Sequence, residues 1–201
     1  FSKIKINKSL DKMAIPGDIA RQILIGDLIV QFKDTKRFEK EVFLEAEKLG
    51  YSKEKIRLLD SRDSVEAAVR IVASRMTWED VDNEKTDFFK KNGRLSIDNY
   101  FYLGLGDCDK YSFLTSAVFR ILKTQSGIEN AHVLPFSLGG NSGLEHVWNT
   151  VVFIEKDKIT FSDIDVVQYD TKNNMDATSW HLDKDNYIQR AFGDKYKSPG
   201  R

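Results

Sequence analysis

The clearest pattern in the chain is a run of apolar residues that recur every three or four positions after Tyr111. This spacing places them on one face of an α-helix of about fifteen residues. Gly127 follows the run and is expected to end the helix. The apolar positions are Phe113, Leu114, Ala117, Val118, Ile121 and Leu122.

Two stretches upstream also have helical spacing. One covers residues 36–49 and is stopped by Gly50, and the other covers residues 64–76 after Asp63, where a capping box is expected. An apolar run at residues 22–31 fits either a helix or a hairpin, and we favour the helix. The expected core positions of the first two helices are Phe38, Val42, Phe43, Ala46, Leu49, Val65, Val69, Val72 and Met76.

The second half of the chain changes to the alternation typical of strands. Side chains alternate between two faces along residues 146–154 and along residues 158–167, and a short turn-forming segment separates the two runs. One face of the first strand is expected to carry His146, Trp148, Thr150 and Val152. The second is expected to carry on one face Ile159, Phe161, Asp163 and Asp165. Two carboxylates therefore interrupt an apolar face, and an acid that binds a histidine would lie there.

Composition narrows the function classes. The 201 residues carry 31 Lys and Arg and 31 Asp and Glu, so no net charge attracts nucleic acid or an anionic membrane. No apolar run approaches the roughly 18 residues that span a bilayer. The length fits one domain, and no oligomeric state is predicted.

The chain begins at Phe1 without a methionine, so we expect a trimmed product, and a preceding secretory signal would give a periplasmic or secreted location.

Cys108 is the sole cysteine, which excludes an internal disulfide, and it lies where the long helix is expected to begin. It follows Gly104 and Gly106, which can form a turn that presents the thiol. At a helix start, unpaired backbone N–H groups and the helix dipole favour the nucleophilic thiolate. The flanking Asp107 and Asp109 oppose that ionisation unless they point at backbone amides or a cation. A small buried hydrophobic role is the alternative.

A thiolate nucleophile needs a base and a group that orients the base. The chain has three histidines, and His132 and His181 have no acid placed near them by local pattern. His146 begins the first predicted strand, and the next strand carries Asp163 and Asp165. The sequence therefore favours a triad of the sole cysteine, His146 and one of these two acids.

The residues at these positions carry a family resemblance. The order Cys108, His146, Asp163, with Gly-Asp-Cys-Asp opening a helix and His-Val-Trp opening a strand, resembles the transglutaminase-like superfamily of papain-type thiol enzymes. Upstream, Ser64–Val72 followed by Met-Thr-Trp is similar to that superfamily's helix leading into an aromatic extended segment. The resemblance covers roughly residues 60–170.

The intervals between these residues refine the resemblance. The Cys-to-His and His-to-Asp intervals of 38 and 17 residues are similar to those of the bacterial transglutaminase-like cysteine proteinases. The chain has Asp163-Ile164-Asp165 where Asp-Pro is usual, which leaves Asp165 as the alternative acid. A tight turn would pair Asp163 with Thr150, about 13 Å from the level of His146. Because the family spacing favours Asp163, we predict a longer or bulged connection that shifts the register and brings Asp163 to His146.

The resemblance implies an α+β fold with a papain/transglutaminase-like core, in which the nucleophile-bearing helix packs on an antiparallel sheet. We expect a catalytic domain at residues 59–201 and a helical N-terminal extension, residues 1–58, packed on it. The implied activity is cysteine-dependent acyl transfer, as hydrolysis of a protein or peptide by a thiol peptidase or amidase. The alternatives are a protein-glutamine γ-glutamyltransferase, in which an amine replaces water, and a non-catalytic binding module.

This chemistry needs no cofactor, but the acids beside the cysteine raise the question of calcium. In some bacterial proteinases that the motif resembles, these acids take part in calcium binding, and Asp107 and Asp109 match those positions. Two carboxylates fall short of the roughly six to eight oxygens that calcium prefers. We therefore favour the alternative, in which one of these acids caps the helix N-terminus.

Aromatic residues are frequent before Cys108, and most are expected to pack in the core. Trp78 and Tyr100 are the candidates for lining the cleft or for donating a hydrogen bond near the thiol, as oxyanion or cleft residues. The glycine-rich segment 139–143 before His146 is either a loop that gates the site or a plain connection.

Overall fold

The computed structural model of the protein describes residues 35–81, 87–93, 95–138, 146–155 and 158–167. Helices and strands are mixed in it, so the predicted α+β class is confirmed. The described helices are α3 (Thr35–Lys48), α4 (Lys53–Arg57), α5 (Ser61–Arg75), α6 (Asp87–Asn92), α7 (Ile97–Leu103) and α8 (Cys108–Ser126). The described strands are β1 (Thr77–Trp78), β2 (Leu105–Gly106), β3 (Ala131–Leu138), β4 (His146–Glu155) and β5 (Lys158–Ile164).

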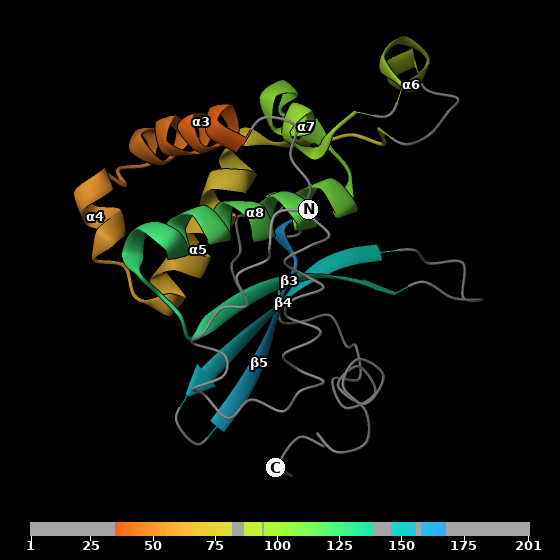
Figure 1. The fold of residues 1–201 in the computed structure, drawn as a ribbon. Coiled ribbons are helices and arrows are strands. Elements are labelled where there is room, and N and C mark those ends of the chain that lie inside the picture. The colour runs from red at the N-terminus through yellow and green to blue at the C-terminus, as the bar shows by residue number, and fades with distance from the viewer. Residues whose placement is uncertain (1–34, 82–86, 94, 139–145, 156–157, 168–201) are drawn as a thin grey trace, which may run out of the picture.

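The helices gather on one side of an antiparallel sheet with strand order β3-β4-β5 (Figure 1). Helix α8 is the centre of this arrangement, because it contacts α3, α4, α5 and α7 as well as strands β3 and β4. A second sheet pairs β1 with β2 in parallel. The predicted packing of the cysteine-bearing helix on an antiparallel sheet is therefore confirmed.

Helix α8 buries more of its surface than one apolar stripe predicts. Leu114, Ala117, Val118 and Leu122 are buried as expected, whereas Phe113 and Ile121 are only partly buried. The helix also buries Tyr111 and Phe119. This follows from its position, because α5 covers one side of α8 and the sheet covers another. Gly127 ends the helix in the left-handed conformation, with φ 71°.

Two predicted helix ends need correction. Helix α5 begins three residues before the predicted position, because the Asp60 carboxylate accepts hydrogen bonds of 2.8 Å from the backbone N–H groups of Arg62 and Asp63. Helix α3 ends at Lys48, and Leu49 beyond it is 38% exposed rather than part of the core. The other expected core positions of α3 and α5 are buried, with Phe43 partly so.

The register of β4 and β5 also differs from the prediction. Glu155 pairs with Lys158, so only residues 156 and 157 connect the strands, and Thr150 pairs with Asp163. The predicted register shift is therefore wrong. Both registers keep the same residues on the same face, because a strand repeats every two residues, so alternation alone does not choose between them.

Part of the predicted N-terminal extension shares the main core. Phe38, Val42 and Ala46 of α3 belong to the same buried cluster as residues of α5, α7 and α8. The ring of Phe38 meets that of Phe101 edge to face, with 5.1 Å between centroids. The helix favoured at residues 22–31 lies outside the described residues.

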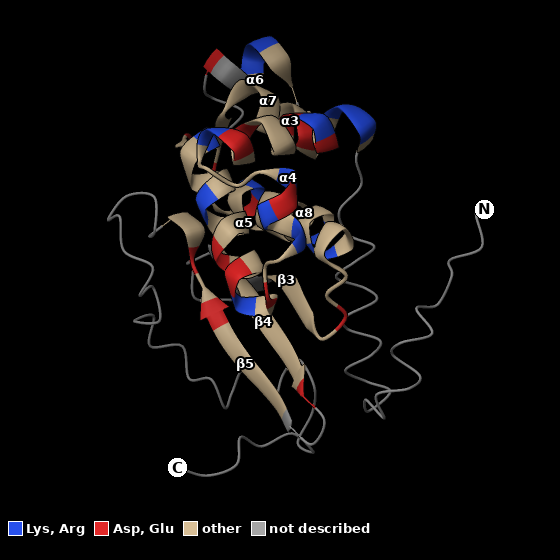
Figure 2. Cartoon of the chain, turned by 90° about the vertical axis from the view of Figure 1, so that its left-hand side faces the viewer, with Lys and Arg blue, Asp and Glu red and all other residues tan. Residues whose placement is uncertain are grey.

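Charged residues of both signs are mixed over the helices, whereas the sheet is largely uncharged (Figure 2). This distribution agrees with the zero net charge of the sequence. Within the described ranges, no helix combines the length and the apolar character that a bilayer crossing needs.

Candidate functional site

Cys108 is the first residue of α8 and is partly exposed. The segment before it is fixed to the body of the protein by backbone hydrogen bonds. Thr77 N–H donates to Gly104 O at 2.8 Å, and Glu79 N–H donates to Gly106 O at 2.9 Å. The thiol is therefore carried on a tethered turn at a helix start, as the glycine spacing predicts.

The two glycines before Cys108 are needed for different reasons. Gly104 has φ 70°, and a Cβ built there would lie 2.8 Å from the carbonyl oxygen of Arg75. Gly106 leaves room for side chains, since a Cβ there would lie 2.7 Å from Lys110 Cβ and 2.8 Å from Met76 Cε. Gly104 therefore allows the left-handed turn, and Gly106 allows Lys110 and Met76 to pack closely against the backbone.

The two aromatic candidates lie in different surroundings. Trp78 pairs with Gly106 across β1 and β2 and is 51% exposed, so it borders the turn that carries Cys108. Tyr100 is buried, and its hydroxyl accepts a hydrogen bond from Leu95 N–H at 3.3 Å. Trp78 is therefore exposed beside the turn that carries Cys108, whereas Tyr100 packs in the core.

Helix α8 is joined to β4 by buried hydrogen bonds one turn beyond Cys108. Ser112 Oγ donates to Trp148 O at 2.7 Å. In the other direction, the side-chain amide of the fully buried Asn149 donates to Ser112 O at 2.9 Å and to Ser116 Oγ at 3.0 Å. The start of α8 is therefore held against the start of β4. Sequence patterning missed these links, although a polar Asn149 within an apolar strand was the available signal.

The opposite end of α8 shows that the helix and the strand run in the same direction. Lys123 Nζ, in the last turn, donates to Ala131 O at 2.7 Å. Ala131 pairs with Phe153 near the end of β4. The start of α8 therefore lies near the start of β4, and the end of α8 lies near the end of β4. Cys108 and His146, which begin these two elements, are at the same end of the layers (Figure 1).

His146 is described through its backbone, as the first residue of β4 opposite Leu138 of β3. Its side chain lies outside the part of the chain that the structure describes, as does the glycine-rich segment 139–143. The structure therefore locates the strand position of the predicted base.

The two candidate acids differ in their hydrogen bonds. The Asp163 carboxylate accepts a hydrogen bond of 2.7 Å from Thr150 Oγ1 across the β4–β5 pair. Asp165 follows the end of β5, is buried, and accepts a hydrogen bond of 3.1 Å from Val167 N–H. Continuing the observed register places Asp165 level with Trp148, which is two residues, or about 7 Å, from the level of His146.

The acids beside the nucleophile are held by a cation from the same helix. Lys110 Nζ lies 2.6 Å from Asp109 Oδ1 and 3.4 Å from Asp107 Oδ1. Burial raises the pKa of Asp109, but hydrogen bonds with Asp107 and Lys110 and the charge of Lys110 outweigh it and hold that pKa below its ordinary value. Asp107 is the N-cap residue by its backbone, yet its side chain makes no capping hydrogen bond. Capping by the Asp107 side chain is therefore wrong, and sequence patterning did not single out Lys110.

These contacts do not fit a calcium site. Both carboxylates already face the Lys110 ammonium group, which a calcium ion would have to displace from a buried position. Among the described residues, no group of three or more His, Cys, Asp and Glu side chains is placed to hold a metal ion. The residues present thus favour an ammonium over calcium at these acids.

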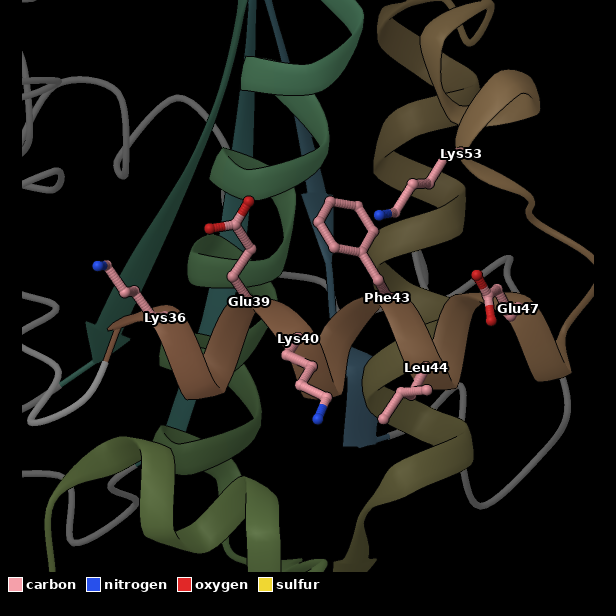
Figure 3. Close-up of a pocket in the computed structure, with 7 residues that line it drawn as sticks. All are labelled: Lys36, Glu39, Lys40, Phe43, Leu44, Glu47 and Lys53. Carbon is pink, nitrogen blue, oxygen red and sulfur yellow. The ribbon is translucent and has the colours of Figure 1, made fainter.

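Two surface hollows lie away from this end of α8. One is on the outer side of α3 and α4 and is lined by Lys36, Glu39, Lys40, Phe43, Leu44, Glu47 and Lys53 (Figure 3). The other lies between the N-terminal part of α3 and the C-terminal half of α8. Neither contains Cys108 or a residue of β4, so they do not contribute to the candidate site.

The candidate site therefore consists of Cys108 on its tethered turn, the start of β4 at His146, and the acids at the end of β5. Its chemistry rests on these residues and on the contacts between their elements. No model of a protein family, no curated protein and no solved structure matches this chain.

Proposed function

We propose that the protein is a cysteine-dependent acyl-transfer enzyme, similar to the transglutaminase-like cysteine peptidases, that hydrolyses amide bonds of a protein or peptide. The observation that supports this function is the common direction of α8 and β4. Hydrogen bonds between Ser112, Trp148 and Asn149 join the two elements near their starts, where Cys108 and His146 lie. A nucleophile and its base must come within hydrogen-bond reach of each other, and a common starting end of the two elements is a precondition for this.

In the proposed reaction, the Cys108 thiolate attacks the amide carbonyl carbon, and the Cys108 backbone N–H donates a hydrogen bond to the oxyanion. The His146 imidazolium gives its proton to the amide nitrogen, which leaves as an amine, and a thioester remains on Sγ. Water then attacks the thioester while the imidazole takes its proton, and a carboxylic acid leaves. Attack by an amine instead of water would make the protein a transferase.

We propose Asp165 as the acid that orients His146, with Asp163 as the alternative. The observed register supports this choice, because it leaves Asp163 level with Thr150, whose hydroxyl donates to it. Asp165 is two residues nearer to the level of His146 and is buried, as expected of a carboxylate that stabilises an imidazolium.

The test uses unfolded casein as a general substrate. We expect the wild-type protein to release peptides, Cys108→Ala to release none, and the surface control Lys40→Ala to match wild type. A fluorescent primary amine added to the same reaction separates the two products, because hydrolysis leaves casein unlabelled and transfer labels it. Equal activity of the Cys108→Ala and wild-type proteins, or no activity on any peptide or protein substrate, would contradict the proposal.

A further inference from the structure

Lys110 is an unusual lysine because its charged end is buried beside the nucleophile. Its side chain is 7% exposed, and those of Asp107 and Asp109 are 17% and 30% exposed. A buried ammonium group is strongly unfavourable unless it is paired and hydrogen-bonded. The two carboxylates supply that pairing at 2.6 and 3.4 Å.

The surroundings of Lys110 fit this side chain closely. Its ammonium group lies 5.1 Å from the centroid of the Tyr100 ring, in reach of a cation–π interaction. Gly106 leaves the space that the lysine stem occupies, since a Cβ there would lie 2.7 Å from Lys110 Cβ. The turn before Cys108 is therefore shaped around the lysine as well as around the thiol.

We infer that Lys110 is a built-in counter-ion of the proposed active site, which neutralises the two acids beside Cys108 and so keeps the thiolate accessible without calcium. This inference rests on the proposed function. Two bare carboxylates flanking a thiol oppose its ionisation, and a cation between them cancels much of that effect. Lys110 is a positioning residue, because it acts through the charge around Cys108 and not on the substrate.

Other titratable groups near this turn must be considered in any measurement against pH. They are Tyr100 of α7 and Glu79 and Asp80 after β1, and the proposed base His146 is considered with them because of its proposed role. None of them changes in the variants below, so a difference between variants reports the charges of Asp107, Asp109 and Lys110.

The test is the rate at which iodoacetamide alkylates Cys108 between about pH 5 and pH 10, with and without a calcium chelator. We expect Lys110→Met to react about tenfold more slowly than wild type at neutral pH, because the uncompensated acids disfavour the thiolate. Lys110→Arg should keep most of the rate. Lys40→Met, which removes an exposed ammonium group from α3, should leave the rate unchanged, and the chelator should have no effect.

A folded Lys110→Met protein that reacts at the wild-type rate would overturn the inference, as would a wild-type rate that depends on calcium. If Lys110→Met does not fold, as judged by circular dichroism, the double variant Asp107→Asn/Asp109→Asn decides the matter. It retains the cation without the acids and should react faster than wild type below neutral pH, and an equal rate would overturn the inference. If wild-type Cys108 reacts no faster than free cysteine, the proposed function fails instead.

Discussion

His132 is a buried histidine outside the predicted triad. It is 5% exposed, and its Nδ1 lies 3.4 Å from Lys123 Nζ at the end of α8 opposite Cys108. Burial, with the positive charge of Lys123, lowers its pKa from 6.5 to about 3. The folded protein therefore keeps His132 neutral at pH values where the unfolded chain protonates it.

This difference predicts a pH-dependent stability. Between the folded pKa of about 3 and the unfolded value of 6.5, the unfolded state binds more protons, so the free energy of unfolding falls as the pH falls. From about pH 7 to about pH 5, His132 should account for a loss of about 2 kcal/mol. Urea denaturation at both pH values should show that His132→Leu lacks this part of the loss, and identical losses in the two proteins would contradict the expectation.

The identity of the orienting acid is testable with two matched variants. We expect Asp165→Asn to lower kcat of casein hydrolysis by at least about a hundredfold, because the imidazolium loses its stabilising charge. Asp163→Asn keeps an oxygen that accepts from Thr150 and should lower kcat by less than about tenfold. The opposite order of effects would restore Asp163 as the acid.

At the residue scale, the sequence identifies residue types better than their partners. The lone Cys108 at a glycine turn was recognisable because glycines and a helix pattern are local signals. Lys110 was not, because its role depends on burial by Tyr100 and by the glycine at position 106. The hydrogen bonds of Asn149 were equally hidden, because they join residues separated by more than 30 positions.

Within the described part of the chain, the turn between α7 and α8 carries the strictest requirement for glycine. Gly104 and Gly127 have nearly the same φ, at 70° and 71°, but only at Gly104 would a Cβ meet backbone, at 2.8 Å from Arg75 O. Arg75 is also held there, because its guanidinium donates to the carbonyl oxygens of Phe101 and Tyr102. The clash has little room to relax.

We therefore predict different effects of alanine at these two glycines. Gly127→Ala should lower the free energy of unfolding by about 1–2 kcal/mol, the usual effect of a left-handed alanine. Gly104→Ala should lower it by at least about 1 kcal/mol more, because the backbone must also shift. Urea denaturation measures both values, and equal losses would show that Arg75 O moves away without resistance.

The types of the long periodic elements α3, α5, α8, β4 and β5 were predictable, whereas their limits and register were not. The strand alternation at residues 146–154 identified β4 but left the pairing of β5 open, because registers two residues apart expose the same faces. The family spacing then favoured the wrong register. The start of α5 was also predicted wrongly, because Asp60 and Asp63 are both acceptable capping residues in the sequence and the helix uses Asp60.

For the whole molecule, the central feature is that α8 lies between the other helices and the sheet, running in the same direction as β4 (Figure 1). The α+β class was predicted from the family resemblance. The common direction of α8 and β4 was not predicted, because it depends on contacts of Ser112, Lys123 and Asn149 that no local pattern specifies.

The most direct test of the account asks whether His146 controls the ionisation of Cys108. The alkylation rate of Cys108 by iodoacetamide is measured against pH in wild type and in His146→Gln, with His132→Gln as the control histidine variant. A paired thiolate predicts rapid alkylation well below pH 8.5, the reference value for free cysteine. His146→Gln should lose that low-pH reactivity, and His132→Gln should retain it. If the wild-type and His146→Gln profiles coincide, Cys108 and His146 do not form a catalytic pair.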